Sequence, residues 1–231
     1  MLVSLITPTG SRPEAFALCE KWMSQQTYKG KMQWLVVDDH PVNPAKLTLG
    51  QELVKAPMWW NPEVNTQRPN MSALLEKVKG DVCLVIEDDE FYAPDYIASM
   101  LKLLEVSQVA GLSSSKYYHL HAPGFKTLDN TKHAPLCHTA LRKEALPLLY
   151  EAVHSGHYYF DIELWKKAQA REIPCALLSN TTLSIGIKGM PGRAGLGTGH
   201  ELVGYQGDRD LTMLKKWLGE DHKYYLPFIK K

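Results

Sequence analysis

The feature that most constrains the fold of this chain is a set of three continuous apolar runs, each of which ends in a cluster of polar residues. The runs begin at Leu2, Met32 and Val82, and the clusters that follow them read TPTGSR, DDH and EDDE. Continuous apolar strands are typical of a parallel sheet that is covered on both faces. Segments with helical periodicity separate the runs, so the sequence predicts an α/β fold with a mostly parallel central sheet flanked by helices.

The predicted elements alternate between strand and helix through about residue 112. Strands are predicted at residues 2–7, 32–40, 56–62, 82–86 and 109–120. Helices are predicted at residues 13–26, 71–81 and 93–107. The rest is less regular, with a short strand and a helix within 135–156, helices at 158–172 and 210–220, and a strand at 175–187. No internal repeat or low-complexity linker interrupts this order, so we expect a single domain.

The composition is ordinary for a soluble globular protein, with 45% hydrophobic and 22% charged residues. A net charge of +1 gives no overall case for binding nucleic acid or a membrane. The charge is uneven, because residues 1–115 carry an excess of four acids and residues 116–231 an excess of five basic residues. The four cysteines form no CxxC pair, and the apolar start is too short to span a membrane, so we expect reduced thiols and a cytoplasmic protein without a membrane partner.

The third polar cluster consists of four consecutive acids, Glu87 to Glu90, directly after an apolar run. Adjacent carboxylates repel one another, and a solvated acidic turn is the alternative interpretation. Ligands of α/β sheets bind beyond the carboxyl ends of the strands, where this cluster and Asp38–Asp39 are expected to lie. Carboxylates suit Mn2+ or Mg2+, cations that commonly bridge a protein to a diphosphate. Because GxGxxG after the first strand and GxxxxGK[ST] are both absent, the sequence favours nucleotide-sugar or nucleotidyl chemistry.

Six segments, in order and at plausible spacing, resemble the GT-A fold glycosyltransferases of the broad family 2 type. They read LITPTGSRPE, WLVVDD, NTQRPNMSALLEKVKGD, IEDDEFYAPDYI, CHTALRKEAL and FDIELWKKA, and together they extend over about residues 2–170. The resemblance implies a GT-A (Rossmann-like) single domain. It also implies metal-dependent transfer of a sugar from a nucleotide-diphosphate donor to an acceptor hydroxyl, on a glycan, a protein or a hydroxylated DNA base.

The resemblance also implies roles for single residues. Pro8, Thr9 and Arg12 would shape the nucleobase pocket. Asp38 or Asp39 would contact the base, and Arg68 or Asn70 would close the pocket. Asp88 and Asp89 match the metal motif, with Asp89 as the direct ligand and Asp88 nearer the ribose. Asp161 matches the general base of inverting members, although an Asp that opens a helix is also a common N-cap.

This chain departs from the family pattern at two places. Where members often have a further metal-binding histidine, it has Ser184 or Gly186, so His200 is the replacement candidate, with a surface loop histidine as the alternative. The usual Glu-Asp pair reads Phe160-Asp161, which leaves Glu163 as a rival base.

Other assignments concern the acceptor side and the aromatic residues. His138 lies in the segment that matches the acceptor wall. Core packing is the favoured interpretation of Trp59 and Trp60, with stacking on a base or sugar as the alternative.

The chain is therefore interpreted as two halves with different tasks. Residues 1–115 would bind the nucleotide-sugar, and residues 116–231 would bind the acceptor and supply catalysis. The glycine-rich loop 188–200 is expected to act as a lid, with Lys188, Arg193 and His200 contacting the donor diphosphate and the metal. Two alternatives stay open: a nucleotidyltransferase acting on a sugar phosphate, and a non-catalytic nucleotide-sugar-binding protein.

Overall fold

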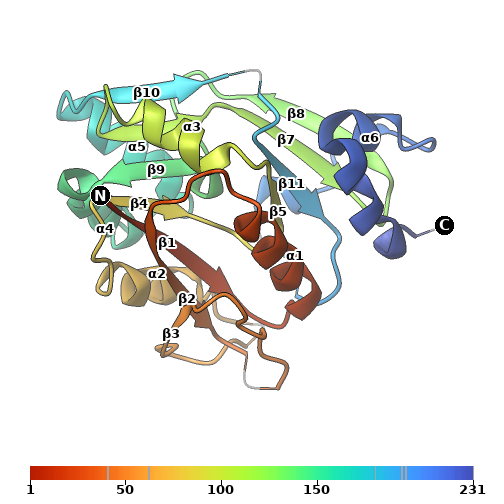
Figure 1. The fold of residues 1–231 in the computed structure, drawn as a ribbon, viewed down its shortest axis with the longest axis horizontal. Coiled ribbons are helices and arrows are strands. Elements are labelled where there is room, and N and C mark those ends of the chain that lie inside the picture. Colours follow the sequence, from red (N-terminus) through yellow and green to blue (C-terminus); the bar gives the residue numbers. More distant parts are fainter. Residues whose placement is uncertain (41, 62, 180, 194, 196, 231) are drawn as a thin grey trace.

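A computed structural model describes residues 1–40, 42–61, 63–179, 181–193, 195 and 197–230. Its largest element is a seven-stranded sheet with the strand order β10-β6-β9-β4-β1-β2-β3 (Figure 1). The strands are β1 (Leu2–Thr9), β2 (Lys31–Asp38), β3 (Glu52–Val54), β4 (Val82–Val85), β6 (Val109–Leu112), β9 (Thr139–Arg142) and β10 (Cys175–Leu178). Only the pairs that involve β9 are antiparallel, so the predicted mostly parallel central sheet is confirmed.

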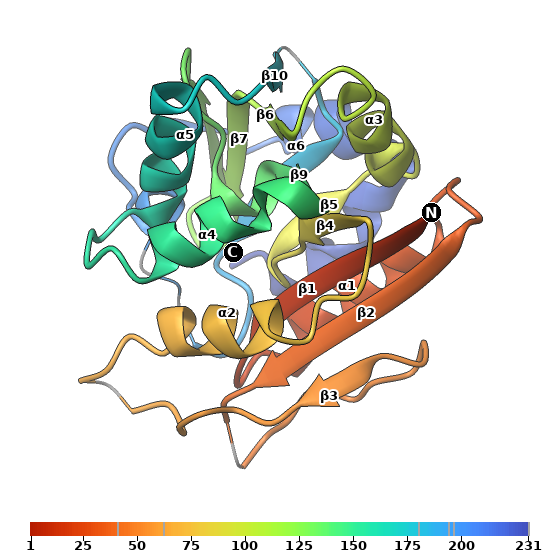
Figure 2. The ribbon, with the colours of Figure 1, turned by 90° about the vertical axis from the view of Figure 1, so that its left-hand side faces the viewer.

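Helices cover both faces of this sheet. They are α1 (Pro13–Ser24), α2 (Gln67–Leu75), α3 (Tyr96–Leu103), α4 (Leu146–Val153), α5 (Phe160–Ala170) and α6 (Thr212–Leu218). Helices α1, α3 and α6 share one apolar core with Leu5 of β1, whereas α2, α4 and α5 share the other with its neighbour Ile6 (Figure 2). Successive strand residues point to opposite faces, so a continuous apolar run supplies both cores at once.

A second sheet lies beside the first and was not predicted from the sequence. It has the order β12-β8-β7-β11-β5. Its strands are β5 (Glu90–Tyr92), β7 (Ser114–His119), β8 (Gly124–Asp129), β11 (Ser184–Lys188) and β12 (Gln206–Gly207). The predicted strands at 109–120 and 175–187 were wrong as single elements, because each divides into one strand of either sheet: β6 and β7, then β10 and β11.

Two further predictions were wrong in position. The third strand is Glu52–Val54, and the described residues between 56 and 61 form no strand. Helix α2 begins at Gln67 and ends at Leu75, earlier than predicted at both ends. Pro69 falls in its first turn, where the missing N–H has no helical partner to lose. No helix in the described part of the chain is long and apolar enough to cross a membrane.

Candidate functional site

The four consecutive acids lie where the two sheets meet. Strand β4 ends just before them, and Glu90 already belongs to β5, which pairs with β11 of the second sheet. Asp88, Asp89 and Glu90 are buried, and Glu87 is half-buried. The alternative of a solvated acidic turn is therefore wrong. Buried carboxylates need partners, because burial without them disfavours the charged form.

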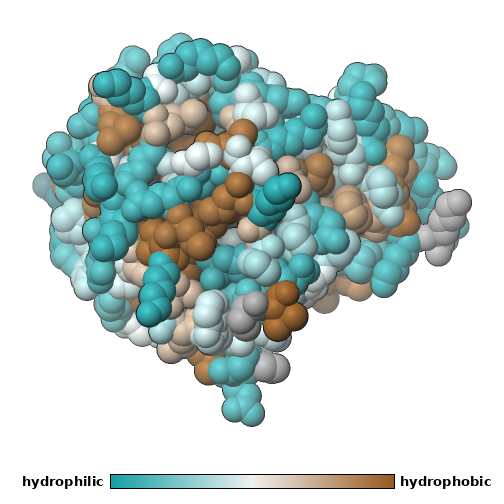
Figure 3. Space-filling model, turned by 60° about the horizontal axis from the view of Figure 1, so that its bottom comes forward, coloured by the Kyte–Doolittle hydropathy of each residue, from teal (hydrophilic) through white to brown (hydrophobic). Residues whose placement is uncertain are grey.

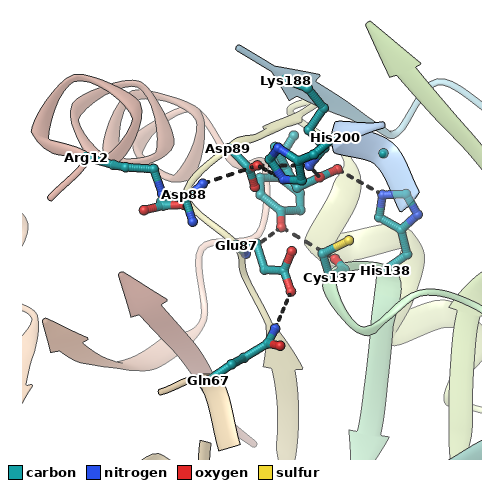
Figure 4. A network of polar contacts seen from close by, with 12 residues as sticks. Arg12, Gln67, Glu87, Asp88, Asp89, Cys137, His138, Lys188 and His200 are labelled. Carbon is teal, nitrogen blue, oxygen red and sulfur yellow. Dashed lines mark hydrogen bonds and ion pairs between the residues drawn. The ribbon is translucent and has the colours of Figure 1, made fainter. Parts of the chain in front are cut away.

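Two cations from distant parts of the chain supply these partners (Figure 4). Arg12, just before α1, places Nη2 3.2 Å from Asp88 Oδ1 and Nη1 3.2 Å from Asp89 Oδ2. Lys188, at the end of β11, places Nζ 2.9 Å from Asp89 Oδ2 and 2.8 Å from Glu90 Oε1. Opposite charges at this distance offset the repulsion among the acids.

The pKa values of the paired groups follow from these contacts. Burial alone would lower the pKa of Lys188, but Asp89 and Glu90 outweigh it and hold that pKa well above its ordinary value. Burial alone would likewise raise the pKa of Asp89, yet Lys188 and Arg12 hold it well below its ordinary value. Asp89 and Lys188 are thus a charged pair inside the protein.

Glu87 has a different environment from the other acids. Burial, together with the neighbouring Asp89, raises the pKa of Glu87 to about 8. Carboxylate oxygens of Glu87, Asp89 and Glu90 all lie within 4.8 Å of one another, so these three side chains could hold one ion between them. Asp88 lies outside this group, since its Oδ2 accepts a 2.5 Å hydrogen bond from Thr9 Oγ1 and its Oδ1 faces Arg12.

The glycine-rich loop reaches the same cluster. His200 Nε2 lies 3.3 Å from Asp89 Oδ2. Gly195 passes so close to His200 that a Cβ at position 195 would lie 2.2 Å from its Nε2. Gly192, with φ of +99°, packs on the backbone of Ser11, where a Cβ would lie 2.0 Å from the carbonyl oxygen. The described part of the loop is therefore docked against the segment that leads into α1.

Asp39 is the centre of a second polar cluster, just after β2 and on the other side of β1 from the acids. Its buried carboxylate accepts hydrogen bonds at Oδ2 from Thr66 Oγ1 and, at 2.8 Å, from Asn70 Nδ2. Arg193 of the glycine-rich loop places Nη1 3.0 Å from Asp39 Oδ1. Gly10 permits this pair, because a Cβ there would lie 2.0 Å from Asp39 Oδ1 and 3.1 Å from the Arg193 guanidinium.

Asn70 and Trp60 add two further groups to this polar cluster. A carboxylate only accepts hydrogen bonds, so the bond to Asp39 fixes which end of the Asn70 amide faces it. The other end, Oδ1, is buried and has no hydrogen-bond partner. Trp60 donates its backbone N–H to the Asp39 carbonyl over 2.9 Å, and its ring lies 5.3 Å from the Arg193 guanidinium. Trp60 is half-buried and Trp59 is 59% exposed, so core packing was the wrong interpretation of Trp59.

Several predicted site residues lie apart from these contacts. Asp38 accepts hydrogen bonds from the backbone of His40 (3.0 Å) and Ala45 (2.6 Å) and so shapes the turn after β2. Arg68 donates to the Val153 carbonyl and lies 5.2 Å from the Phe160 ring. Pro8 is half-buried near the end of β1, opposite Val37.

The residues predicted for the acceptor side have contrasting surroundings. Asp161 is half-buried in the first turn of α5, and burial raises its pKa. Glu163 instead pairs with exposed Lys166 (3.1 Å) and with His157 (3.8 Å). His138 is fully buried behind Glu90, with its Nε2 3.2 Å from Glu90 Oε2.

The ion pair between Glu90 and buried Lys188 was not predicted from the sequence. Lys188 was assigned to the glycine-rich loop 188–200, but it is the last residue of β11 and 4% exposed. A signal was present, since Lys188 follows the apolar run SIGI just as Glu87 follows VCLVI. A positive charge after one buried strand and negative charges after another indicate that the ends of these two strands lie close together, so that the charges can pair.

Comparisons with known proteins bear on the fold. No protein-family model and no curated protein sequence matches this chain. Among solved structures, S. aureus TarS 1–349 in complex with UDP matches with a TM-score of 0.58 and 13% identity, covering 81% of this chain and 60% of that one. Mannosyltransferase PcManGT from Pyrobaculum calidifontis, in complex with GDP-Man and Mn2+, matches with a TM-score of 0.57 and 12% identity, covering 82% and 57%.

A third match is 2-C-methyl-D-erythritol 4-phosphate cytidylyltransferase from Thermus thermophilus, with a TM-score of 0.47 and 19% identity, covering 78% of this chain and 90% of that one. The two glycosyltransferase matches show that this chain has the GT-A fold as a single domain, as the sequence predicted. The chain spans at most 60% of either of them.

Proposed function

We propose that this protein is a glycosyltransferase that moves a sugar from a nucleotide-diphosphate donor to an acceptor hydroxyl. The observation that carries the proposal is the position of two polar sites at the ends of β2 and β4, the two strands that flank β1, bridged by the segment Gly10–Arg12 that follows β1. Gly10 lies against Asp39, and Arg12 pairs with Asp88 and Asp89. A nucleotide has the same division, with a base at one end and a charged diphosphate at the other.

The polar cluster around Asp39 would bind the base. Asn70 Oδ1 is a buried acceptor without a partner, so an N–H group on a base edge would satisfy it. The ring of Trp60 offers a surface for stacking beside Arg193. A base bound there would share Asp39 with Arg193 or take its place.

The acidic cluster would bind the diphosphate end through a cation. Glu87, Asp89 and Glu90 offer only carboxylate oxygens, the ligands that Mn2+ or Mg2+ prefers. Such an ion offsets the negative charge that grows on the departing diphosphate. Arg12 and Lys188 hold Asp89 in place and add positive charge to the same region. Asp88, bonded to Thr9, would face the ribose, and His200 would support the metal side through Asp89.

Asp161 is the proposed general base that takes the proton from the acceptor hydroxyl. Burial raises the pKa of Asp161 above its ordinary value and so makes it a stronger base, whereas Glu163 is held in ion pairs with Lys166 and His157. We expect Asp161→Asn to lose transfer by a factor of about 100 to 10,000 while it still binds donor. Glu163→Gln is the matched control and should keep most activity. The opposite ranking of the two variants would assign the base to Glu163.

The test of the activity is a screen of UDP- and GDP-sugars in the presence of Mn2+. Release of a nucleoside diphosphate, with the sugar found on water or an added acceptor, is the expected result. Release of pyrophosphate would instead favour a nucleotidyltransferase, and nucleotide binding without any product would favour a non-catalytic binding protein. EDTA should abolish the turnover, and full activity in EDTA would end the metal assignment.

A further inference from the structure

A cavity of about 600 Å³ lies between helix α2 and the turn that follows α4, apart from the two polar clusters. Figure 2 shows α2 and α4 side by side, and both pack into the same apolar core. The lower part of Figure 1, which includes α2, comes forward in Figure 3 and displays apolar side chains among hydrophilic ones. The cavity volume is in the range of small-molecule binding sites.

Arg68, in the first turn of α2, lines one end of this cavity. It is half-buried, it donates to the Val153 carbonyl through Nη1, and its guanidinium carbon lies 5.2 Å from the centre of the Phe160 ring. Its other terminal nitrogen, Nη2, is buried without a hydrogen-bond partner. No carboxylate among the described residues forms an ion pair with Arg68, whereas Arg12 and Arg193 each pair with a buried aspartate. Arg68 is therefore a partly desolvated charge that the described protein groups leave without a counter-charge.

The other polar groups that line the cavity favour an anion at the Arg68 end. Ser72, one turn along α2, brings a hydroxyl that can donate to an oxyanion. His154 donates through Nδ1 to the Tyr150 carbonyl over 2.8 Å and places its Nε2 3.4 Å from Ser72 Oγ. Glu76, the carboxylate among the described lining residues, is exposed and comes about 12 Å farther along the helix axis than Arg68. Solvent screens an exposed charge more than a half-buried one, so Arg68 decides the charge preference of the cavity.

We infer that this cavity binds a small molecule through a carboxylate or phosphate group held by Arg68. The anion accepts hydrogen bonds from the Ser72 hydroxyl and from the guanidinium N–H groups that the described protein contacts do not use. A planar guanidinium matches the oxygen geometry of both anions. The body of the ligand contacts the apolar part of the lining, which includes Pro57, Pro69 and Ala73. The inference goes beyond the proposed sugar transfer and does not depend on it.

Four probes that share one benzene ring separate charge from shape: benzoate, benzamide, benzamidine and phenylphosphonate. A titration of the whole protein followed by amide NMR gives each dissociation constant and shows which residues respond. We expect benzoate to bind about tenfold or more tightly than benzamide and benzamidine, as one charge-assisted contact provides, with shifts at α2 and the turn after α4. Equal affinity for these three probes, no binding, or shifts confined to other regions overturns the inference.

Phenylphosphonate distinguishes the two oxyanions. If it binds more tightly than benzoate, the natural ligand carries a phosphate, and if it binds less tightly, the natural ligand carries a carboxylate. Both results require the benzoate preference over benzamide, because the inference fails without it.

Two arginine variants locate the binding. Arg68→Gln removes the charge but keeps an amide that can donate to the Val153 carbonyl, so it should weaken benzoate about tenfold and leave benzamide unchanged. Arg142→Gln is the matched control and should leave benzoate unchanged. Arg142 is also half-buried and also donates to backbone carbonyls, but it lies outside the cavity. If Arg68→Gln binds benzoate as tightly as Arg142→Gln does, the cavity is not the site.

A second pair of variants tests the site without altering Arg68. Ser72→Asp places a carboxylate one turn from Arg68, where it can pair with the guanidinium, so it should weaken benzoate and strengthen benzamidine. Ser72→Asn, which is similar in size and neutral, should keep the preference for benzoate. The dispersion of the amide spectrum shows whether each variant is folded. If folded Ser72→Asp ranks the probes as the unchanged protein does, the inference is overturned, even where Arg68→Gln fails to fold.

Discussion

The two polar sites at the carboxyl edge of the central sheet begin from the same sequence pattern but stabilise their carboxylates in different ways. Asp39 is held by two neutral donors, Thr66 and Asn70, and by Arg193, which is 19% exposed. Asp89 is held by two cations, buried Lys188 and half-buried Arg12. A hydrogen-bonded carboxylate suits recognition of a particular edge of a ligand, whereas a charge cluster suits a cation or a diphosphate. The first site should therefore control donor affinity and the second turnover.

The largest expected effect on stability comes from removing the buried cation. Lys188→Met would leave Asp89 and Glu90 buried without their nearest counter-charge, and should lower the free energy of unfolding by about 3–5 kcal/mol. Lys188→Arg, which keeps the charge, should lose much less. Urea denaturation monitored by tryptophan fluorescence measures both. Equal losses in the two variants would show that packing, and not charge, makes Lys188 necessary.

The largest expected effect on turnover comes from Asp89. Asp89→Asn removes the charge that faces Lys188, Arg12 and the proposed cation, and should lower kcat by about 100- to 1,000-fold. Glu105→Gln, at an exposed acid in the turn after α3, should leave kcat unchanged. Release of nucleoside diphosphate with increasing Mn2+ is the measurement. An Asp89→Asn enzyme with normal kcat would remove the acidic cluster from the proposed chemistry.

A smaller effect, on affinity alone, is expected at the other site. Asp39→Asn weakens the contact with Arg193 and disturbs the orientation of Asn70, so the Kd for donor should rise by about tenfold. The kcat at saturating donor should stay close to that of the unchanged protein. Asp38→Asn is the neighbouring control, since Asp38 bonds only to backbone N–H groups among the described contacts. A fall in kcat for Asp39→Asn, at unchanged Kd, would reverse the roles assigned to the two sites.

The smallest expected effect concerns the ion pair between Arg193, in the glycine-rich loop, and Asp39. Arg193→Ala removes a partly exposed ion pair, which should cost about 1 kcal/mol of unfolding free energy or less. Its clearer result should be faster proteolysis of the loop 188–200, because the Arg193–Asp39 pair anchors that loop. Limited proteolysis with and without UDP and Mn2+ measures the effect. Equal cleavage of the variant and the unchanged protein would show that the glycine contacts alone hold the loop.

The sequence was informative where local pattern decides the structure. The runs that became β1, β2 and β4 are continuous and apolar, and that property follows from burial on both faces whatever their partners are. The local sequence could not decide whether Asp38 or Asp39 is the residue that would contact the base. Adjacent strand residues point to opposite faces of the sheet. Asp39, and not Asp38, belongs to the polar cluster because Asn70, which is distant in the sequence, lies on its side and donates a hydrogen bond to it.

The division into two sheets was hidden for a similar reason. The chain leaves the central sheet at Ser113, in the middle of a run whose composition suits a strand throughout. The ion pair of Lys188 with Glu90 joins residues 98 positions apart. No local preference encodes such a pair, since a buried lysine is stable only when the opposing charge arrives from elsewhere.

The seam between the two sheets also has a mechanical consequence. Strand β5 continues directly from the acidic run, and it is hydrogen-bonded to β11, whose last residue returns an ion pair to that run. Any shear of one sheet against the other would pull Lys188 away from Asp89 inside a medium of low dielectric constant, where separating charges is costly. The two sheets are therefore clamped together as one stiff body. Adjustment to substrates of different size must come from the loop that lies across the seam.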